Sequence, residues 1–237
     1  MKGAVRIGVL GGTLDPIHVG HIATALGARR ALKLDCVYVL PAHVPPHRPQ
    51  QPIASGYHRF AMAALAVNGE AGLAASDIEL RTPGPSYTSD TLTRFREQNG
   101  LEATQIFFIT GADAFAEIET WHRYPDVLDL AQFVVVSRPG VASENLRTRL
   151  PALCPRMVSV APEGRADAGF DSARTSRIFL VDAATPDVSS TGIRKRLLAG
   201  EPVAKLVPAA VERHIVQHGL YAERGGPLAA DHLHGEN

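Results

Sequence analysis

The chain has 237 residues, of which 45% are hydrophobic and 20% are charged, which is the composition of a globular protein with a sizeable core. Its 24 basic residues balance 24 acidic ones, so it lacks the basic excess typical of proteins that bind nucleic acid or anionic membranes. No apolar run is long enough to cross a bilayer, and the charged start has no secretory core. We therefore expect a cytoplasmic protein that binds small molecules, with neither nucleic acid nor membrane as a partner.

Short apolar runs alternate with helical patterns along the chain. Residues 5–10 and 35–40 predict two buried strands, and residues 19–32 between them predict a helix. A strand, a helix and a strand in succession predict a right-handed βαβ unit and a parallel sheet. Further strands are predicted at 78–81, 105–110, 133–136, 157–160 and 178–181, and further helices at 55–68, 88–100, 111–118, 126–130, 188–200 and 208–218. We expect an α/β fold with a doubly wound parallel sheet.

The domain organisation follows from the same pattern. We predict one domain over residues 1–221, with the sheet core at about 1–188 and a small helical C-terminal subdomain at 189–221. Residues 141–176 are the least regular part. The polar tail over 222–237 is expected to be disordered.

The block from Gly11 to His21 is the first candidate site. Paired glycines, Gly11 and Gly12, end an apolar run, and His18 and His21 stand at the head of the predicted helix. Free N–H groups at such a turn and at a helix N-terminus attract anions. The two imidazoles, three residues apart, lie on one helix face. No glutamate completes a zinc-hydrolase motif, so the pattern favours phosphate binding.

A second candidate block is Ser189-Ser190-Thr191 with Arg194, at the head of another predicted helix. Hydroxyls, free amides and an arginine suit phosphate oxygens. Taken alone, the block also fits an ordinary capped helix with an exposed arginine. Beside a phosphate turn, it predicts the second half of a polyphosphate clamp.

A proline-rich loop over residues 41–49 carries His47 and Arg48 after a predicted strand. Proline at this density excludes helix and sheet interiors. A basic loop at a strand's carboxyl end suits a ligand site, but a solvated surface loop explains this segment equally well.

These blocks resemble the two motifs of the HxGH-type nucleotidylyltransferase superfamily. Along nearly its full length the chain resembles the bacterial nicotinate-nucleotide adenylyltransferases, with further matching blocks at 84–88, 111–113 and Trp121. It departs from that family's pattern at Leu14, where phenylalanine is usual, at Arg48, where lysine is common, and near His214, where tyrosine is usual. The resemblance implies a Rossmann-like fold.

The resemblance also implies a reaction. The family transfers AMP from ATP to nicotinate mononucleotide, forming nicotinate adenine dinucleotide (deamido-NAD) and pyrophosphate in NAD biosynthesis. The acceptor phosphate attacks in line without a covalent enzyme intermediate, so catalysis consists of positioning and charge stabilisation. Mg²⁺ would enter as Mg-ATP, held mainly by the phosphates and not by a protein metal site. ATP and nicotinate mononucleotide are the expected partners, and a homo-oligomer is compatible with the sequence.

By the same resemblance, His18, His21 and Arg194 would be the catalytic residues. ATP would be bound by Gly11, Gly12, Thr13, His18, His21, Gly111, Asp113, Ser190, Thr191 and Arg194. The acceptor would be bound by His47, Arg48, Ser86, Tyr87, Thr88 and Trp121.

Two alternatives stay open at this point. One is another adenylyltransferase of the superfamily, with nicotinamide mononucleotide or phosphopantetheine as acceptor. The block at 85–88 and the chain length argue against phosphopantetheine, whereas the choice between nicotinate and nicotinamide depends on backbone placement. The other alternative is a non-catalytic nucleotide sensor, against which the retention of both histidines and Arg194 argues.

Overall fold

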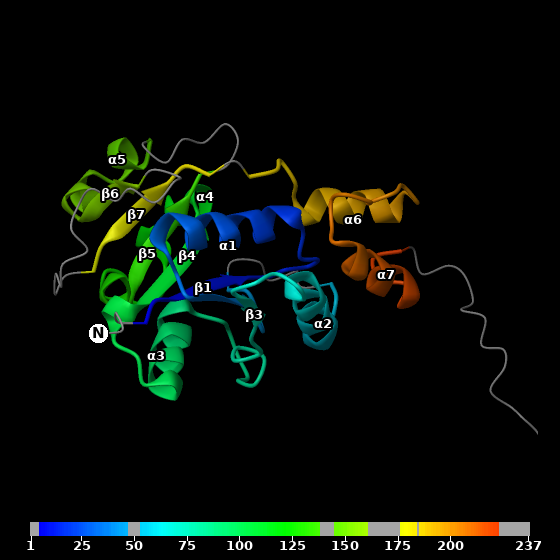
Figure 1. Ribbon diagram of the computed structural model, residues 1–237, viewed down its shortest axis with the longest axis horizontal. Coiled ribbons are helices and arrows are strands. Elements are labelled where there is room, and N and C mark those ends of the chain that lie inside the picture. The colour runs from blue at the N-terminus through cyan, green and yellow to red at the C-terminus, as the bar shows by residue number, and fades with distance from the viewer. Residues whose placement is uncertain (1–4, 47–52, 138–144, 161–175, 184, 223–237) are drawn as a thin grey trace, which may run out of the picture.

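The structure is a computed structural model that describes residues 5–46, 53–137, 145–160, 176–183 and 185–222. Its described strands form one seven-stranded sheet in the order β3-β2-β1-β4-β5-β7-β6, with every pair parallel (Figure 1). They are β1 (Ile7–Gly12), β2 (Cys36–Pro41), β3 (Leu73–Ala75), β4 (Ile106–Gly111), β5 (Gln132–Val136), β6 (Met157–Val160) and β7 (Ile178–Val181). The predicted α/β class and parallel sheet are confirmed.

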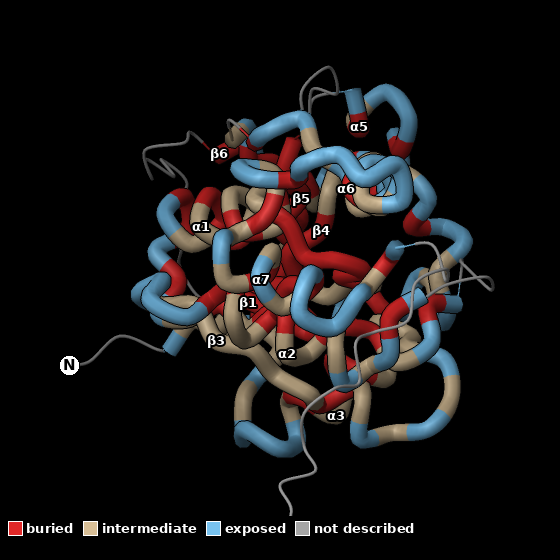
Figure 2. Tube along the Cα trace, turned by 90° about the vertical axis from the view of Figure 1, so that its right-hand side faces the viewer, coloured by how far each residue is buried: buried red, intermediate tan, exposed pale blue. Residues whose placement is uncertain are grey.

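Helices cover both faces of the sheet. They are α1 (Val19–Leu32), α2 (Gly56–Val67), α3 (Thr88–Asn99), α4 (Ala112–Phe115), α5 (Asn145–Arg149), α6 (Ser190–Leu198) and α7 (Ala209–Gln217), with 3-10 turns at Ala103–Gln105, Ile118–Thr120, Asp126–Asp129 and Pro151–Arg156. Successive β5 residues alternate between two cores: Val134 belongs to the core that includes residues of α1, α2, α6 and α7, and Phe133 belongs to the core that includes residues of α3, α4 and α5. The strands are therefore apolar on both faces, and Figure 2 shows them as the buried centre.

Local signals explain where several helices begin and end. The Ser55 hydroxyl accepts a hydrogen bond from the backbone N–H of His58 at 3.3 Å and caps α2, as its sequence position predicts. Gly100 ends α3 with φ of 60°, a left-handed conformation that glycine adopts without steric cost. At the start of α3, Tyr87 occupies the cap position and makes no side-chain cap bond.

The strand predicted at 78–81 is also wrong. These residues form a turn, in which the backbone N–H groups of Leu80 and Arg81 both donate to the Asp77 carbonyl. The Asp77 carboxylate also pairs with Arg81 at 2.7 Å, so local bonds replace ladder bonds. The edge strand is β3 instead, a short alanine-rich segment without the β-branched residues that mark a strand.

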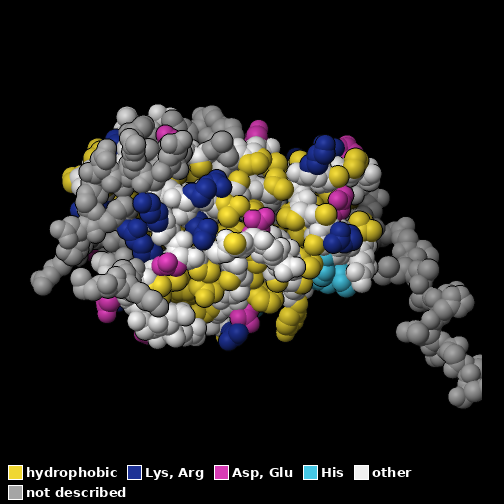
Figure 3. Space-filling view, in the orientation of Figure 1, with side chains coloured by type: hydrophobic (Ala, Val, Ile, Leu, Met, Phe, Trp, Pro, Cys, Tyr) yellow, Lys and Arg dark blue, Asp and Glu magenta, His cyan; other side chains and the backbone are white. Residues whose placement is uncertain are grey.

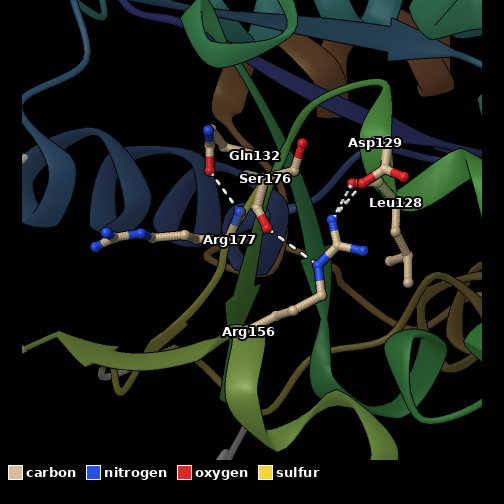
Figure 4. Close-up of polar contacts among 6 residues, drawn as sticks. All are labelled: Leu128, Asp129, Gln132, Arg156, Ser176 and Arg177. Carbon is tan, nitrogen blue, oxygen red and sulfur yellow. Dashed lines mark hydrogen bonds and ion pairs between the residues drawn. The ribbon is translucent and has the colours of Figure 1, made fainter. Parts of the chain in front are cut away.

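At the edge of the sheet formed by β7 and β6, polar contacts tie the chain together near the amino ends of β5 and β7 (Figure 4). The Arg156 guanidinium donates to the Ser176 carbonyl at 3.0 Å and to the Asp129 carboxylate at 2.6 Å. The side-chain oxygen of Gln132 accepts the backbone N–H of Arg177 at 2.7 Å. These contacts fix the strand ends that lie away from the candidate site.

The order of the strands predicts where a ligand would bind. The chain leaves β1 toward β2 on one side, and β4 pairs with β1 on the other, with Leu10 opposite Ile109. In open α/β sheets the ligand crevice lies at such a reversal, outside the carboxyl ends of the strands. None of the helices over the described residues has the length and apolar character that crossing a membrane requires.

The close packing of β1 against β2 gives a test of the fold. A Cβ atom at Gly8 would lie 2.7 Å from Val37 Cγ2 and 3.0 Å from Leu34 Cδ1, whereas one at Gly12 meets nothing nearer than 3.5 Å. We expect Gly8→Ala to lower the free energy of unfolding by about 1–3 kcal/mol through overpacking. Gly12→Ala, the matched control, should change it by less than about 1 kcal/mol. Urea denaturation of both variants checks this, and equal effects would contradict it.

Candidate active site

A cleft of about 600 Å³ opens at the carboxyl ends of β1 and β4, where the strand order reverses. Its volume is within the range of small-molecule sites. Ten residues of its wall were singled out from the sequence: Gly11, Gly12, Thr13, His21, Ser86, Tyr87, Thr88, Gly111, Trp121 and Ser190. The structure thus brings six of the ten residues that the resemblance assigns to ATP, and four of the six that it assigns to the acceptor, to one cavity.

Gly11 and Gly12 form part of the cleft wall without being required by the packing of the chain. A Cβ on Gly11 would meet Phe108 at 3.6 Å and one on Gly12 would meet Leu14 at 3.5 Å, both ordinary contacts. Bare backbone at these positions keeps the wall open, so a phosphate can approach the main chain closely.

The two histidines of the first block are stacked at the start of α1. His18 is the N-cap residue and is buried, and its ring lies 3.7 Å from the ring of His21, centroid to centroid. The backbone N–H of His18 donates to Nδ1 of His21 at 3.2 Å. In a neutral His21 the proton therefore sits on Nε2. Because His21 lines the cleft, it can offer this N–H to a ligand, with His18 packed against it.

Gly20 lies between the histidines for a steric reason. A Cβ there would come within 3.0 Å of two atoms of the His18 ring. Any larger residue would push that ring out of place. Glycine at position 20 thus leaves room for the His18 ring.

The second block docks directly on the first. The Ser190 hydroxyl donates to the Pro16 carbonyl at 2.9 Å, and Nη1 of Arg194 donates to the Asp15 carbonyl at 2.6 Å. Thr191 accepts a hydrogen bond from Nη2 of Arg194 at 3.3 Å. The N-terminus of α6 therefore stands beside the N-terminus of α1, although the two blocks are about 170 residues apart.

Asp15 is the buried centre of this region. Its carboxylate accepts the backbone N–H groups of Ile53 at 2.8 Å and Ala54 at 3.1 Å, and the Tyr221 hydroxyl at 2.6 Å. Burial and the negative Asp15 raise the pKa of the Tyr221 phenol far above its usual range, so the phenol stays a donor. Asp15 thereby joins the loop after β1 to the start of α2 and to the segment after α7.

Arg59 of α2 fixes the two loops beneath the cleft. It is 1% exposed, and its guanidinium donates to the carbonyls of Thr13 at 2.9 Å, His43 at 3.3 Å and Ala42. Burial lowers the pKa of Arg59, and the nearby Asp15 opposes that shift. The loops that follow β1 and β2 are thus held by one cation.

Ser86, Tyr87, Thr88 and Trp121, which the resemblance assigns to the acceptor, form another part of the wall. Ser86 Oγ accepts the backbone N–H of His43 at 2.8 Å, and the Tyr87 ring stacks on His122 with centroids 4.2 Å apart. Trp121 is half-buried and stands edge-on to Phe108 at 6.0 Å. Trp121 therefore packs against the core and lines the cleft at once.

The comparisons with known proteins agree with this architecture. The family model described as cytidylyltransferase-like matches residues 9–196. A protein from Desulfatibacillum aliphaticivorans named "Probable nicotinate-nucleotide adenylyltransferase" is 38% identical over 92% of this chain and 100% of its own length. One of the same name from Roseiflexus sp. (strain RS-1) is 42% identical over 91% and 97%. The chain belongs to the nicotinate-nucleotide adenylyltransferase family of cytidylyltransferase-like proteins.

A solved structure of this family shares the fold. The nicotinic acid mononucleotide adenylyltransferase of Plasmodium falciparum, complexed with NaAD, matches with a TM-score of 0.68. The two chains are 17% identical, and the match covers 92% of this chain and 97% of the other. At this identity the likeness concerns the fold, and it confirms the Rossmann-like architecture expected of the family.

Some residues that the resemblance assigns lie off the cleft wall. Asp113 is exposed in the first turn of the short helix α4. His18 is packed behind His21, and Arg194 is half-buried on α6 against the Asp15 loop. His47 and Arg48 fall outside the described residues.

Other residues of the site were not predicted. Arg59 lies within an otherwise apolar helix face, which is the one signal it gives in the sequence. Glu79 lies in the segment assigned wrongly to a strand; it is buried on the cleft wall and accepts the Thr91 hydroxyl at 2.8 Å. Burial raises the pKa of Glu79, although hydrogen bonds from Ser86 and Thr91 oppose the shift.

The raised pKa of Glu79 predicts a pH-dependent stability. The folded protein holds this proton more tightly than the unfolded chain, so stability falls as pH rises from the unfolded pKa through the folded one. Glu79→Gln removes this loss and keeps an oxygen for the Thr91 hydroxyl. We expect the variant to gain stability relative to wild type as pH rises above the ordinary pKa of a glutamate.

Urea unfolding at a series of pH values measures the difference. Glu97→Gln, at an exposed position of α3, is the matched control and should show a much smaller trend. A stability difference for Glu79→Gln that does not change with pH would refute the assignment.

Proposed function

We propose that this chain transfers the adenylyl group of ATP to nicotinate mononucleotide, forming nicotinate adenine dinucleotide and pyrophosphate in NAD biosynthesis. The observation that carries the proposal is the docking of Ser190 and Arg194 on the Asp15–Pro16 loop beside His21, at a cleft whose wall also holds residues that the resemblance assigns to the acceptor. The names of the relatives agree with it. ATP as substrate fits action in the cytoplasm.

The first half of the cleft is suited to a polyphosphate. The N-termini of α1 and α6 both meet there, and each adds partial positive charge. We assign the backbone of Gly11, Gly12 and Thr13 and the Nε2–H of His21 to the α-phosphate and leaving group. Thr191 and Arg194, beside Ser190, would hold the outer phosphates. We assign Asp113, near the end of β4, to the ribose hydroxyls.

The second half is suited to a pyridine nucleotide. Trp121 offers an aromatic surface for the ring. The backbone N–H groups of Ser86 and Tyr87 are used inside the loop, by the carbonyls of Val44 and Pro85. We therefore assign the ring carboxylate to the amide of Thr88, at the start of α3, where the first N–H groups have no partner inside the helix.

The reaction needs no protein nucleophile. An oxygen of the acceptor phosphate forms a bond to the α-phosphorus, the bond to the bridging oxygen breaks, and pyrophosphate leaves with that electron pair. Negative charge grows on the leaving group, so the donors of His21 and Arg194 stabilise the transition state. Pre-positioning by the contacts of Arg194 with Asp15 lowers the cost of ordering that side chain.

Magnesium fits this scheme as part of the substrate, Mg-ATP. Two carboxylates lie among the described residues of the wall: Glu79, bonded to Thr91, and Glu117, paired with Arg149. Neither belongs to a convergent set of oxygen ligands. We therefore assign the cation to the phosphates of ATP, whose charge it neutralises.

Pyrophosphate release from Mg-ATP tests the function with nicotinate mononucleotide, nicotinamide mononucleotide and phosphopantetheine as separate acceptors. We expect turnover with nicotinate mononucleotide, and a kcat/KM for the nicotinamide compound lower by about tenfold to a hundredfold, because the amide contact to a carboxylate is charge-assisted. Preference for another acceptor would refute the substrate assignment. No turnover with any acceptor would favour a nucleotide sensor.

The stacked histidines give a second test. His18→Ala should lower kcat by about two to three orders of magnitude, with a smaller effect on ATP binding, because the imidazole pair supports transition-state charge. His18→Asn separates this role from structure, since asparagine is a good N-cap. It should restore stability lost in the alanine variant without restoring kcat. A kcat within a few-fold of wild type in either variant would contradict the role.

A further inference from the structure

Three histidines meet on the surface away from the cleft. His58 comes from α2, and His214 and His218 come from α7 and its C-cap position. Figure 3 shows histidine side chains gathered in one exposed patch at the end of the molecule where Figure 1 places α2 and α7. None of the three lines the proposed active site.

Their nitrogen atoms converge on one point. One ring nitrogen from each residue lies within 4.8 Å of the other two, and Nδ1 of His58 is 3.1 Å from Nε2 of His214. In a tetrahedral zinc site, ligand nitrogens lie about 2.0–2.1 Å from the metal and hence about 3.3 Å from each other. A hydrogen bond between two neutral rings explains the 3.1 Å contact, but it does not use the third imidazole.

The two helices hold the rings in place before any ligand arrives. His214 and His218 are four residues apart, so they project from one face of α7. The backbone of His58 is bound to the Ser55 cap in the first turn of α2, which packs against α7. His58 and His214 are half-buried and His218 is exposed, which leaves the solvent side open to a further ligand.

The electrostatics favour a neutral imidazole at His214, and the neutral form is the one that binds a metal. Burial lowers the pKa of His214, and the neighbouring His218 and His58 lower it further, because a positive ring there would repel theirs. Imidazole nitrogen is a preferred ligand of zinc and the other late first-row divalent cations.

We propose that His58, His214 and His218 bind one late first-row divalent cation, for which Zn²⁺ is the probe, with water in the remaining position. The ion would tie α7 to α2. The buried contact of Tyr221 with Asp15 already links the segments next to these helices, since Ala54 and Tyr221 bond to the same carboxylate. The metal would be a second tie across that junction, independent of the proposed enzyme activity.

Calorimetric titration of the full-length, chelator-treated chain with Zn²⁺, in the absence of nucleotide, tests the site. We expect one tight site per chain, weakened about tenfold or more in His214→Ala and in the exposed His218→Ala. Titration with Co²⁺ should give visible bands of a nitrogen-ligated, four-coordinate ion, and both variants should lose them. His232→Ala/His234→Ala, which removes the other two histidines near the end of the chain, is the matched control and should bind like wild type.

Thermal unfolding measures whether the bound metal stabilises the junction of α2 and α7. Zn²⁺ should raise the midpoint of wild type and of the His232→Ala/His234→Ala control, and should leave His218→Ala unchanged, because a ligand stabilises only the state that binds it. Binding that survives both His214→Ala and His218→Ala, or that is lost in the control, would overturn the proposal. So would the absence of Zn²⁺ binding to wild type.

Discussion

The rest of the site depends on the hydrogen bonds that the buried carboxylate of Asp15 accepts. A charge removed from water is costly unless hydrogen bonds replace its hydration. Here two backbone N–H groups before α2 and the Tyr221 hydroxyl supply those bonds, and the cation of Arg59 lies nearby. These hydrogen bonds fix the loop after β1. The carbonyls of that loop then accept hydrogen bonds from the side chains of Ser190 and Arg194 in α6. One satisfied carboxylate thus positions residues from the beginning, middle and end of the described chain.

The balanced overall charge conceals a cleft built for anions. Its positive character comes from a few groups: the helix N-termini of α1 and α6 and the imidazole of His21 at the wall, and the guanidinium of Arg194 off the wall on α6. The carboxylates on the described wall are engaged by other side chains, so they do not compete for the ligand. Such a local set of groups suits a polyphosphate in a pocket even in a chain whose overall charge is balanced.

The regular elements follow from the sequence because their signals are local. Continuous apolar runs predict β1, β2 and β4 to within two residues, and the helical period predicts α1 with its observed bounds. The sequence did not predict β3, because three residues rich in alanine carry little strand preference. The strand predicted at 78–81 was wrong because a turn can also bury one apolar residue. Arg59, Glu79 and the meeting of His58 with His214 depend on contacts across the fold, which spacing along the chain does not encode. The histidine and glycine block at 11–21 could be predicted as a candidate site because its residues lie close together in the sequence.

The distance along the chain between contacting residues has a consequence for how the protein is made. Ser190 meets Pro16 across 174 residues, and Tyr221 meets Asp15 across 206. Contacts of such long range form late, after the entropy of closing the loop has been offset by other packing. A growing chain that has completed β1, β2 and β4 therefore has only the part of the cleft that these strands form. At that stage the Asp15 loop lacks its partners from α6 and from the segment after α7. The ability to hold ATP should arise abruptly, when the last turn of α7 and Tyr221 have left the ribosome.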